Sequence, residues 1–271
     1  MELTRPIRAL IRGLDALTVL NSRDGATVSE VAQEIRLPRT TVYRILETLC
    51  NSGFVVRDAV DDRYRLTIMV RSLSGGFDDE GWVTRVAKPL IAELCRDICW
   101  PVALASLSGT AMMIRETTDH ETPLAMERQS AGLRLSLLHS AAGQAYLACC
   151  PAPERAGLID ALARSTQEDD KPAREQRADL ERQLSDIASQ GYATASRTRR
   201  LIEELSIAVP VTVDDRVLAV LSVRFMTQAL PAKTGLERFL PKLRQSAAKI
   251  TASFLEQPAE AHKNAAPEAA V

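Results

Sequence analysis

Residues 28–52 constrain the fold of this chain more than any other stretch, because two helical patterns follow each other there with a very short break. Apolar residues recur at helical spacing over residues 28–35 and again over residues 42–49. Arg36-Leu37-Pro38 separates the two patterns, since a proline disfavours helix in the residue before it. The spacing therefore predicts two short helices joined by a tight turn, a helix-turn-helix.

The second of these helices carries a polar face near its start. Its side chains are short hydroxyls and arginines, which supply the donors that a DNA major groove would need. The residues are Arg39, Thr40, Thr41, Tyr43 and Arg44. An ordinary helical hairpin with a solvated polar face would show the same pattern, and both interpretations stay open for the hairpin alone.

A predicted wing follows the helix pair. Residues 54–57 and 63–66 have the pattern of two short strands around a polar turn, and Arg57, Arg63 and Arg65 lie on or near them. In a winged helix these arginines would meet phosphates or a minor groove, with bidentate contacts that lysine cannot make. Taken alone, they would be solvated hairpin charge.

A linker is predicted over residues 67–84. It begins as a helix with exposed apolar residues and reaches a flexible joint at Gly75-Gly76. Because such residues need a partner, we expect a second copy of the same helix and hence a dimer. Before the helix pair, an amphipathic helix over residues 7–20 places its apolar residues on one broad face. Its members are Ile7, Leu10, Ile11, Leu14, Leu17 and Leu20.

The remainder of the chain has the pattern of an α+β domain. The expected helices cover residues 83–98, 154–163, 175–189 and 236–255, with a polar loop over residues 165–172. The expected strands cover residues 102–107, 112–116, 124–129, 205–213 and 217–225. Residues 257–271, rich in Ala, Pro and Glu, are expected to form a disordered tail.

Two features of this domain suggest a ligand site. Small residues open a helix within residues 139–148, where free backbone N–H groups would favour a carboxylate ligand, although tight helix packing explains them equally well. Ser206, Ser222 and Arg224 interrupt otherwise apolar strands. A polar residue in such a strand either faces an edge or lines a pocket.

Composition limits the other possibilities. A net charge of −1 over 271 residues means that any nucleic-acid surface is local, and the length suits two domains better than one. Five cysteines without a C-x-x-C pair fit reduced thiols in a cytoplasmic protein. We expect no signal peptide and no membrane span, since no apolar run approaches about 18 residues.

No catalytic constellation is found in the sequence. P-loop, G-x-S-x-G, H-E-x-x-H and G-x-G-x-x-G motifs are missing, and His120, His139 and His262 lie far apart. We therefore expect no enzyme, no metal site and no cofactor.

Several motifs taken together resemble one family of bacterial regulators. They are R-L-P-R-T-T-V-Y-R-I-L-E-T-L, D-D-R-Y-R-L-T, H-S-A-A-G-Q-A-Y-L-A and S-I-A-V-P-V. In this order they resemble the IclR family of transcription regulators over roughly residues 5–255. Within that family, R-L-T-I-M-V-R-S-L-S-G-G-F-D-D-E-G-W and M-I-R-E-T-T resemble activators of phenylpropionate-type aromatic catabolism.

The resemblance implies an architecture and an oligomeric state. A winged helix-turn-helix over residues 1–66 and the linker would precede an effector-binding domain over residues 85–256. That domain would be GAF-like, a curved antiparallel sheet flanked by helices. Dimers, often paired into tetramers on DNA, are implied as well.

The resemblance also implies the effector contacts, which lie between the sheet and the small-residue helix. They fall on Ala141, Ala142, Ser196, Ser206, Ser222 and Arg224. The family often has a cysteine where Ser206 stands and a small residue where Arg224 stands. Arg224 suggests that the effector is an acid, because a buried guanidinium needs an anionic partner, but an internal carboxylate could equally satisfy it.

The sequence thus predicts a ligand-responsive DNA-binding transcription regulator that controls an aromatic-acid catabolic operon. Its partners would be an operator DNA, a small aromatic carboxylic acid and further copies of the chain. Two alternatives stay open. One is a GAF-like enzyme with an accessory DNA-binding head, and the other is an architectural DNA-binding protein that senses nothing.

Overall fold

The computed structural model describes residues 6–23, 25–73, 81–125, 127–199 and 202–256. The chain forms two compact units, Met1–Asp78 and Asp79–Val271, and each is considered by itself. The glycine joint and the tail expected over residues 257–271 lie outside the described residues.

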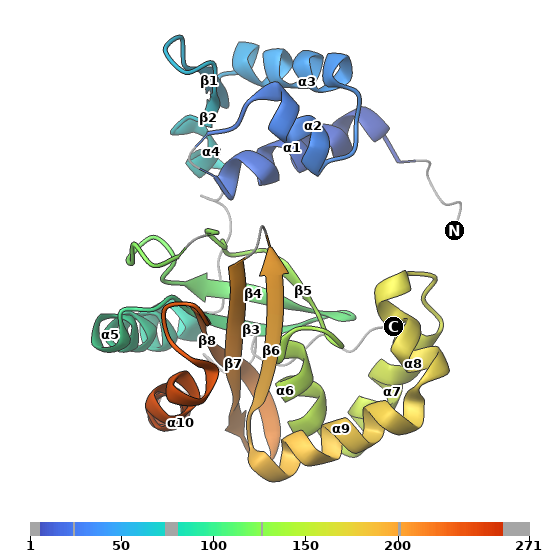
Figure 1. Ribbon diagram of the computed structural model, residues 1–271, viewed down its shortest axis with the longest axis vertical. Helices are drawn as coiled ribbons and strands as arrows, with labels where there is room; N and C mark the ends of the chain where they lie inside the picture. The colour runs from blue at the N-terminus through green and yellow to red at the C-terminus, as the bar shows by residue number, and fades with distance from the viewer. Residues whose placement is uncertain (1–5, 24, 74–80, 126, 200–201, 257–271) are drawn as a thin grey trace. The chain divides into compact units, whose positions relative to one another are not determined.

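The N-terminal unit contains the predicted helix pair and wing, so both predictions are confirmed. Its elements are α1 (Arg8–Asn21), α2 (Val28–Glu34), α3 (Arg39–Asn51), β1 (Val55–Arg57), β2 (Tyr64–Leu66) and α4 (Met69–Ser72) (Figure 1). Helix α2 begins at a capping box, in which Thr27 accepts from the backbone N–H of Glu30 and the Glu30 carboxylate accepts from that of Thr27. In the turn before α3, Arg36 adopts a φ of 54°.

Helix α1 forms as predicted, but it buries only part of its apolar face. Its core contacts come from Ala16, Val19 and Leu20 in its last turns, which pack with α2, α3 and the wing. The four apolar residues nearer its start are between 46% and 70% exposed: Ile7, Leu10, Ile11 and Leu14. The apolar face is therefore only partly buried, because α1 extends past the small core of this unit.

The C-terminal unit is built on a six-stranded antiparallel sheet, as expected for the α+β class. Its strands lie in the order β5-β4-β3-β8-β7-β6. They are β3 (Val102–Ser108), β4 (Ala111–Thr117), β5 (Arg134–Ser136), β6 (Ala193–Arg199), β7 (Ile202–Val213) and β8 (Arg216–Met226). The long β7–β8 hairpin is the predicted central one.

Helices cover both faces of this sheet (Figure 1). The π-helical turn η1 (Val83–Ala87), α5 (Lys88–Ile98) and α10 (Ala232–Leu255) pack on one face. Helix α6 (Ala141–Cys149) packs on the other, with α7 (Ala152–Ala163) and α9 (Arg177–Gln190) behind it. None of the helices among the described residues is long and apolar enough to cross a membrane.

Two segments differ from their prediction. No strand forms in the described part of residues 124–129, because side chains take up the backbone donors there: Thr122 accepts from the N–H of Leu124, and Asp119 accepts from that of Gln129. The predicted polar loop contains η2 (Glu168–Asp170) and leads into α8 (Lys171–Glu175), so the charged helix expected from residue 175 begins at Arg177.

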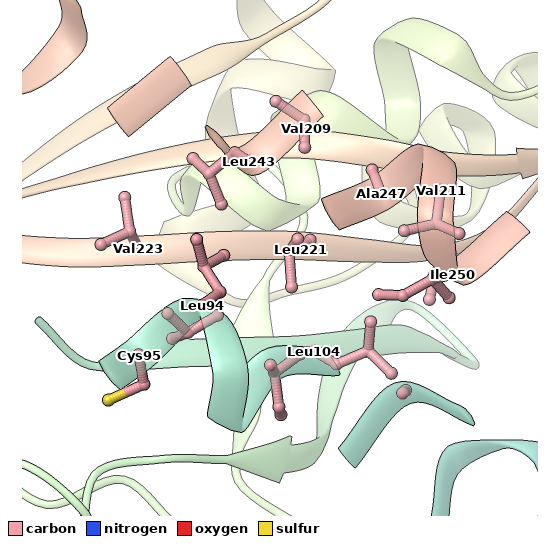
Figure 2. Packing of buried hydrophobic residues seen from close by; sticks show 14 of the residues in the cluster. Leu94, Cys95, Leu104, Val209, Val211, Leu221, Val223, Leu243, Ala247 and Ile250 are labelled. Atoms are coloured by element: carbon pink, nitrogen blue, oxygen red, sulfur yellow. The ribbon is translucent and has the colours of Figure 1, made fainter. Parts of the chain in front are cut away.

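The two sheet faces have different cores. Figure 2 shows the face toward α5 and α10, where Leu94, Leu243 and Ile250 pack against strand residues such as Leu221. Every second residue of β7 and β8 enters this core: Leu205, Ile207, Val209, Val211, Ala219, Leu221, Val223 and Phe225. Between them, Ala208 and Val220 enter the core around α6, and Ser206, Ser222 and Arg224 lie on the same side of the sheet by alternation.

Candidate nucleic-acid interface and effector site

The start of α3 presents the predicted polar face to solvent. Val42 and Leu46 anchor the helix in the core, whereas Arg39, Thr40, Tyr43 and Arg44 are exposed and Thr41 is half-buried. Within the described part of the chain, no carboxylate pairs with Arg39 or Arg44. The helix therefore offers two guanidinium groups whose charge is not neutralised, beside hydroxyl donors.

The wing arginines are close together, but each of them is paired. Arg57 meets Asp62 at 2.5 Å, and Arg65 meets Asp58 at 2.8 Å and Asp61 at 2.5 Å. The hydrogen bond from Arg65 lowers the pKa of Asp61 to about 2. The sequence prediction treated the turn acids as a simple turn and missed that they match the wing arginines in number.

The third wing arginine ties the wing to α2. Arg63 donates to Glu30 at 3.1 Å and to the carbonyl of Gly25 at 3.0 Å. Nearby, the hydroxyl of the buried Tyr64 donates to the Glu47 carboxylate of α3 at 3.0 Å. Burial and this carboxylate raise the pKa of Tyr64 to about 12, so the hydroxyl remains a donor at neutral pH.

In the C-terminal unit, the small-residue start of α6 is tightly packed. Ala141 and Ala142 are buried, and a Cβ on Gly143 would lie 2.4 Å from the Cα of Leu137. The Ser140 hydroxyl already accepts from the N–H of Gly143 at 2.9 Å. These contacts favour the packing explanation for the small residues.

The structure brings three of the predicted effector contacts onto the sheet face that α6 covers. Ser206 lies directly opposite Arg224 in the β7–β8 register, and the Ser222 hydroxyl donates to the carbonyl of Ala103 at 3.4 Å. Ser196 is not brought together with them. It pairs with Leu205, whose side chain enters the α5–α10 core, so Ser196 faces the other side of the sheet.

Arg224 forms the centre of a buried ionic cluster. Its side chain is only 6% exposed and donates to Asp119 at 2.5 Å and to Glu204 at 2.9 Å. The sequence left open that an internal carboxylate satisfies Arg224, and the structure shows two such carboxylates. No sequence pattern pointed to Asp119, which lies 105 residues away along the chain.

Asp119 is also fixed by its own loop. It accepts from the hydroxyl of Thr117 and from the N–H of Gln129 at 2.7 Å. The Nε of Arg224, by contrast, is a buried donor with no hydrogen-bond partner among the described residues. Nowhere among the described residues do three His, Cys, Asp or Glu side chains gather in a way that could hold a metal ion.

A winged helix-turn-helix with an exposed basic helix face, followed along the chain by a sheet-and-helix unit with a buried ionic cluster, fits the class of two-domain transcription regulators. Residues 9–59 match the IclR helix-turn-helix domain, and residues 80–252 match the C-terminal domain of bacterial transcriptional regulator IclR. The chain belongs to the IclR family.

Relatives and solved structures agree with this assignment. The chain is 29% identical to the HTH-type transcriptional regulator BhcR of Paracoccus denitrificans over 52% of its own length and 50% of that of BhcR. For three curated relatives, the matched segment spans between 50% and 62% of the relative's length.

Among solved structures, an IclR family regulator from Brucella abortus is 25% identical, with a TM-score of 0.54 over 93% of this chain and 94% of that one. An IclR homologue from Microbacterium hydrocarbonoxydans, complexed with 4-hydroxybenzoate, is 21% identical. Its TM-score is 0.56 over 92% of this chain and 98% of the homologue. The second likeness shows the shared fold.

Proposed function

We propose that this chain is a transcription regulator that binds operator DNA through α3 and responds to a small-molecule effector. The observation that carries the proposal is the free basic face of α3. Arg39 and Arg44 are exposed, and no carboxylate in the described part of the chain pairs with them. The opposite side of the helix is anchored by Val42 and Leu46. Guanidinium groups so placed can donate to guanine or to phosphates in a major groove.

Binding to the DNA upstream of its own gene tests this role. We expect salt-dependent binding by the full chain, and a loss of about tenfold or more for Arg44→Ala, because each good base contact contributes roughly 1–3 kcal/mol. Arg216→Ala, which removes the same charge from the exposed first residue of β8 in the C-terminal unit, is the control. Equal weakening by both variants, or no salt dependence, contradicts the proposal.

The wing would add contacts from Arg57, Arg63 and Arg65 to the DNA backbone or minor groove. Because all three are paired, phosphates would have to replace Asp58, Asp61, Asp62 or Glu30 as their partners. Exposed ion pairs contribute little stability, so this exchange is inexpensive. The wing is thus expected to contribute less affinity than α3.

For the effector, we propose a small aromatic carboxylic acid that binds between α6 and the sheet. The supporting observations are that Ser206, Ser222 and Arg224 face α6 and that a homologue of the same fold was solved with 4-hydroxybenzoate. Control of an aromatic-acid catabolic operon, in the manner of phenylpropionate-responsive activators, follows as the biological role. A thermal-shift panel on the full chain tests the class: aromatic acids should raise the melting temperature, and matched aromatic alcohols should not.

We also propose that the chain works as a homodimer through its N-terminal unit. Ile7, Leu10, Ile11 and Leu14 form an exposed apolar side of α1, and Ile68 and Leu73 are 74% and 63% exposed. Residues of this kind need a covering partner, and a second copy of the chain is the simplest one. Sedimentation of the full chain should give a dimer that Leu10→Glu dissociates; an unchanged dimer would place the interface elsewhere.

A further inference from the structure

The two carboxylates around Arg224 are not equivalent. Asp119 has no exposed side-chain surface and is held by Thr117 and by the N–H of Gln129 as well as by Arg224. Glu204 is 24% exposed, and the described residues supply its carboxylate with one hydrogen bond, from Nη1 of Arg224. Asp119 is therefore a fixed counterion, whereas Glu204 can leave at a lower cost.

The cluster carries more negative than positive charge. Arg224 is one cation between two carboxylates, so Asp119 alone would neutralise it. Its Nε is a buried donor for which the described residues supply no acceptor. A buried unsatisfied donor is costly, which means that an acceptor supplied from outside would gain a hydrogen bond that Glu204 does not make.

A second arginine lies beside Glu204. In the β6–β7 register Arg197 stands directly opposite Glu204, so both side chains leave the sheet on the α6 face. Arg197 is exposed on the edge strand β6. A Glu204 side chain that turned away from Arg224 would thus meet another guanidinium instead of losing all of its electrostatic stabilisation.

We propose that Glu204 is an exchangeable internal ligand of Arg224, which a small carboxylate displaces toward Arg197. This inference rests on the proposed function and adds how an acid gains access to a guanidinium that is already paired. The exchange leaves the charge around Arg224 unchanged, because one carboxylate replaces another. Each binding event would also change the contacts of the edge strand β6, which couples the ligand to the edge of the sheet.

Calorimetric titration of the full chain with benzoate tests the exchange. In most chains Glu204 occupies Arg224, and only the small fraction in which Glu204 has turned away can bind benzoate. The apparent affinity is the intrinsic affinity multiplied by that fraction, so Glu204→Gln should bind benzoate roughly tenfold more tightly. Glu203→Gln is the matched control, because Glu203 is the neighbouring residue, faces the opposite side of β7 and accepts from Thr227 rather than Arg224. It should bind as the unaltered chain does.

Arg197→Gln gives a second readout. It should weaken benzoate binding in the unaltered chain but not in the Glu204→Gln background, since only a displaced Glu204 needs Arg197. Equal affinities for the unaltered chain and Glu204→Gln, equal tightening by both glutamate variants, or no benzoate binding by any of these proteins would overturn the exchange. Binding to operator DNA tests the DNA-binding role separately, and success there together with either of the first two outcomes would reject the exchange alone. No benzoate binding by any of these proteins would also contradict the proposed aromatic-acid effector.

Discussion

The wing and the sheet of this protein hold arginine–carboxylate clusters of similar chemistry in opposite surroundings. In the wing, the paired side chains are between 31% and 69% exposed. Around Arg224 they are between 0% and 24% exposed. Exposed pairs are screened by water and salt, whereas a buried charge that loses its partner stays uncompensated. The same residue types are therefore replaceable contacts throughout the wing, whereas around Arg224 the fully buried Asp119 is a structural requirement.

Removal of Asp119 should produce the largest effect. Asp119→Ala leaves Arg224 buried with one remaining partner and frees the N–H of Gln129, so we expect a loss of about 3–5 kcal/mol in the free energy of unfolding. Denaturant unfolding monitored by circular dichroism measures this loss.

Asp160→Ala provides the matched control, because Asp160 pairs with Arg177 at the same 2.5 Å distance but on an exposed surface. It should unfold almost as the unaltered chain does. A comparable loss for both variants would show that burial does not distinguish the two clusters.

Glu30 is the intermediate case, since it serves both the capping box and the pair with Arg63. Glu30→Ala should cost about 1 kcal/mol, the usual contribution of a helix cap. Glu30→Gln should cost less, because glutamine can complete a capping box without the charge. Thermal unfolding of the N-terminal unit within the full chain measures both variants; equal losses would mean that the charge carries the contribution.

The pH dependence of Glu30 separates these contributions further. The hydrogen bond from the backbone of Thr27, with added effects of the Thr27 hydroxyl and Arg63, lowers the pKa of Glu30 below its ordinary value of 4.5. The resulting stability is fully present above that ordinary value and is lost as pH falls through the lower folded value. Between neutral pH and about pH 3, the difference between the unaltered chain and Glu30→Gln should therefore shrink. A constant difference would contradict the assignment.

The smallest effect on stability is expected from Asp62→Asn, which frees Arg57 at the exposed wing. The melting temperature should not change measurably, because such pairs contribute little. Binding to DNA should become tighter and its dependence on salt steeper by about one in the logarithmic slope, since Arg57 could then meet a phosphate. Unchanged affinity and slope would indicate that Arg57 does not reach the DNA.

The sequence predicted those elements whose periodicity is local. The helix pair, the wing strands and the β7–β8 hairpin each follow from apolar spacing within about a dozen residues. The side of Ser196 could not be predicted in this way, because a shift of one residue in strand register reverses the face. The buried part of the apolar face of α1 could not be predicted either, since the size of the core, and not the spacing of Leu10 and Leu14, decides what is buried.

Arg224 shows the same limit for the site. Its position inside an apolar strand indicated a buried cation, and a buried cation needs an anionic partner. The anions that pair with Arg224 are Asp119 and Glu204, which lie 105 and 20 positions away along the chain. Local sequence patterns carry no information on contacts at such separations.

The hydrogen bond between Tyr64 and Glu47 has a mechanical consequence. Tyr64 also pairs with Ala26, so β2 is fastened both to α3 and to the segment that leads into α2. The wing and α3 are thus held in a fixed relation to each other by Tyr64, and binding to DNA requires little ordering within either of them. A unit that is preorganised in this way loses little conformational entropy when it binds DNA. In the proposed dimer, adjustment to different operators would then come from the distance between the two N-terminal units rather than from a change of shape within either unit.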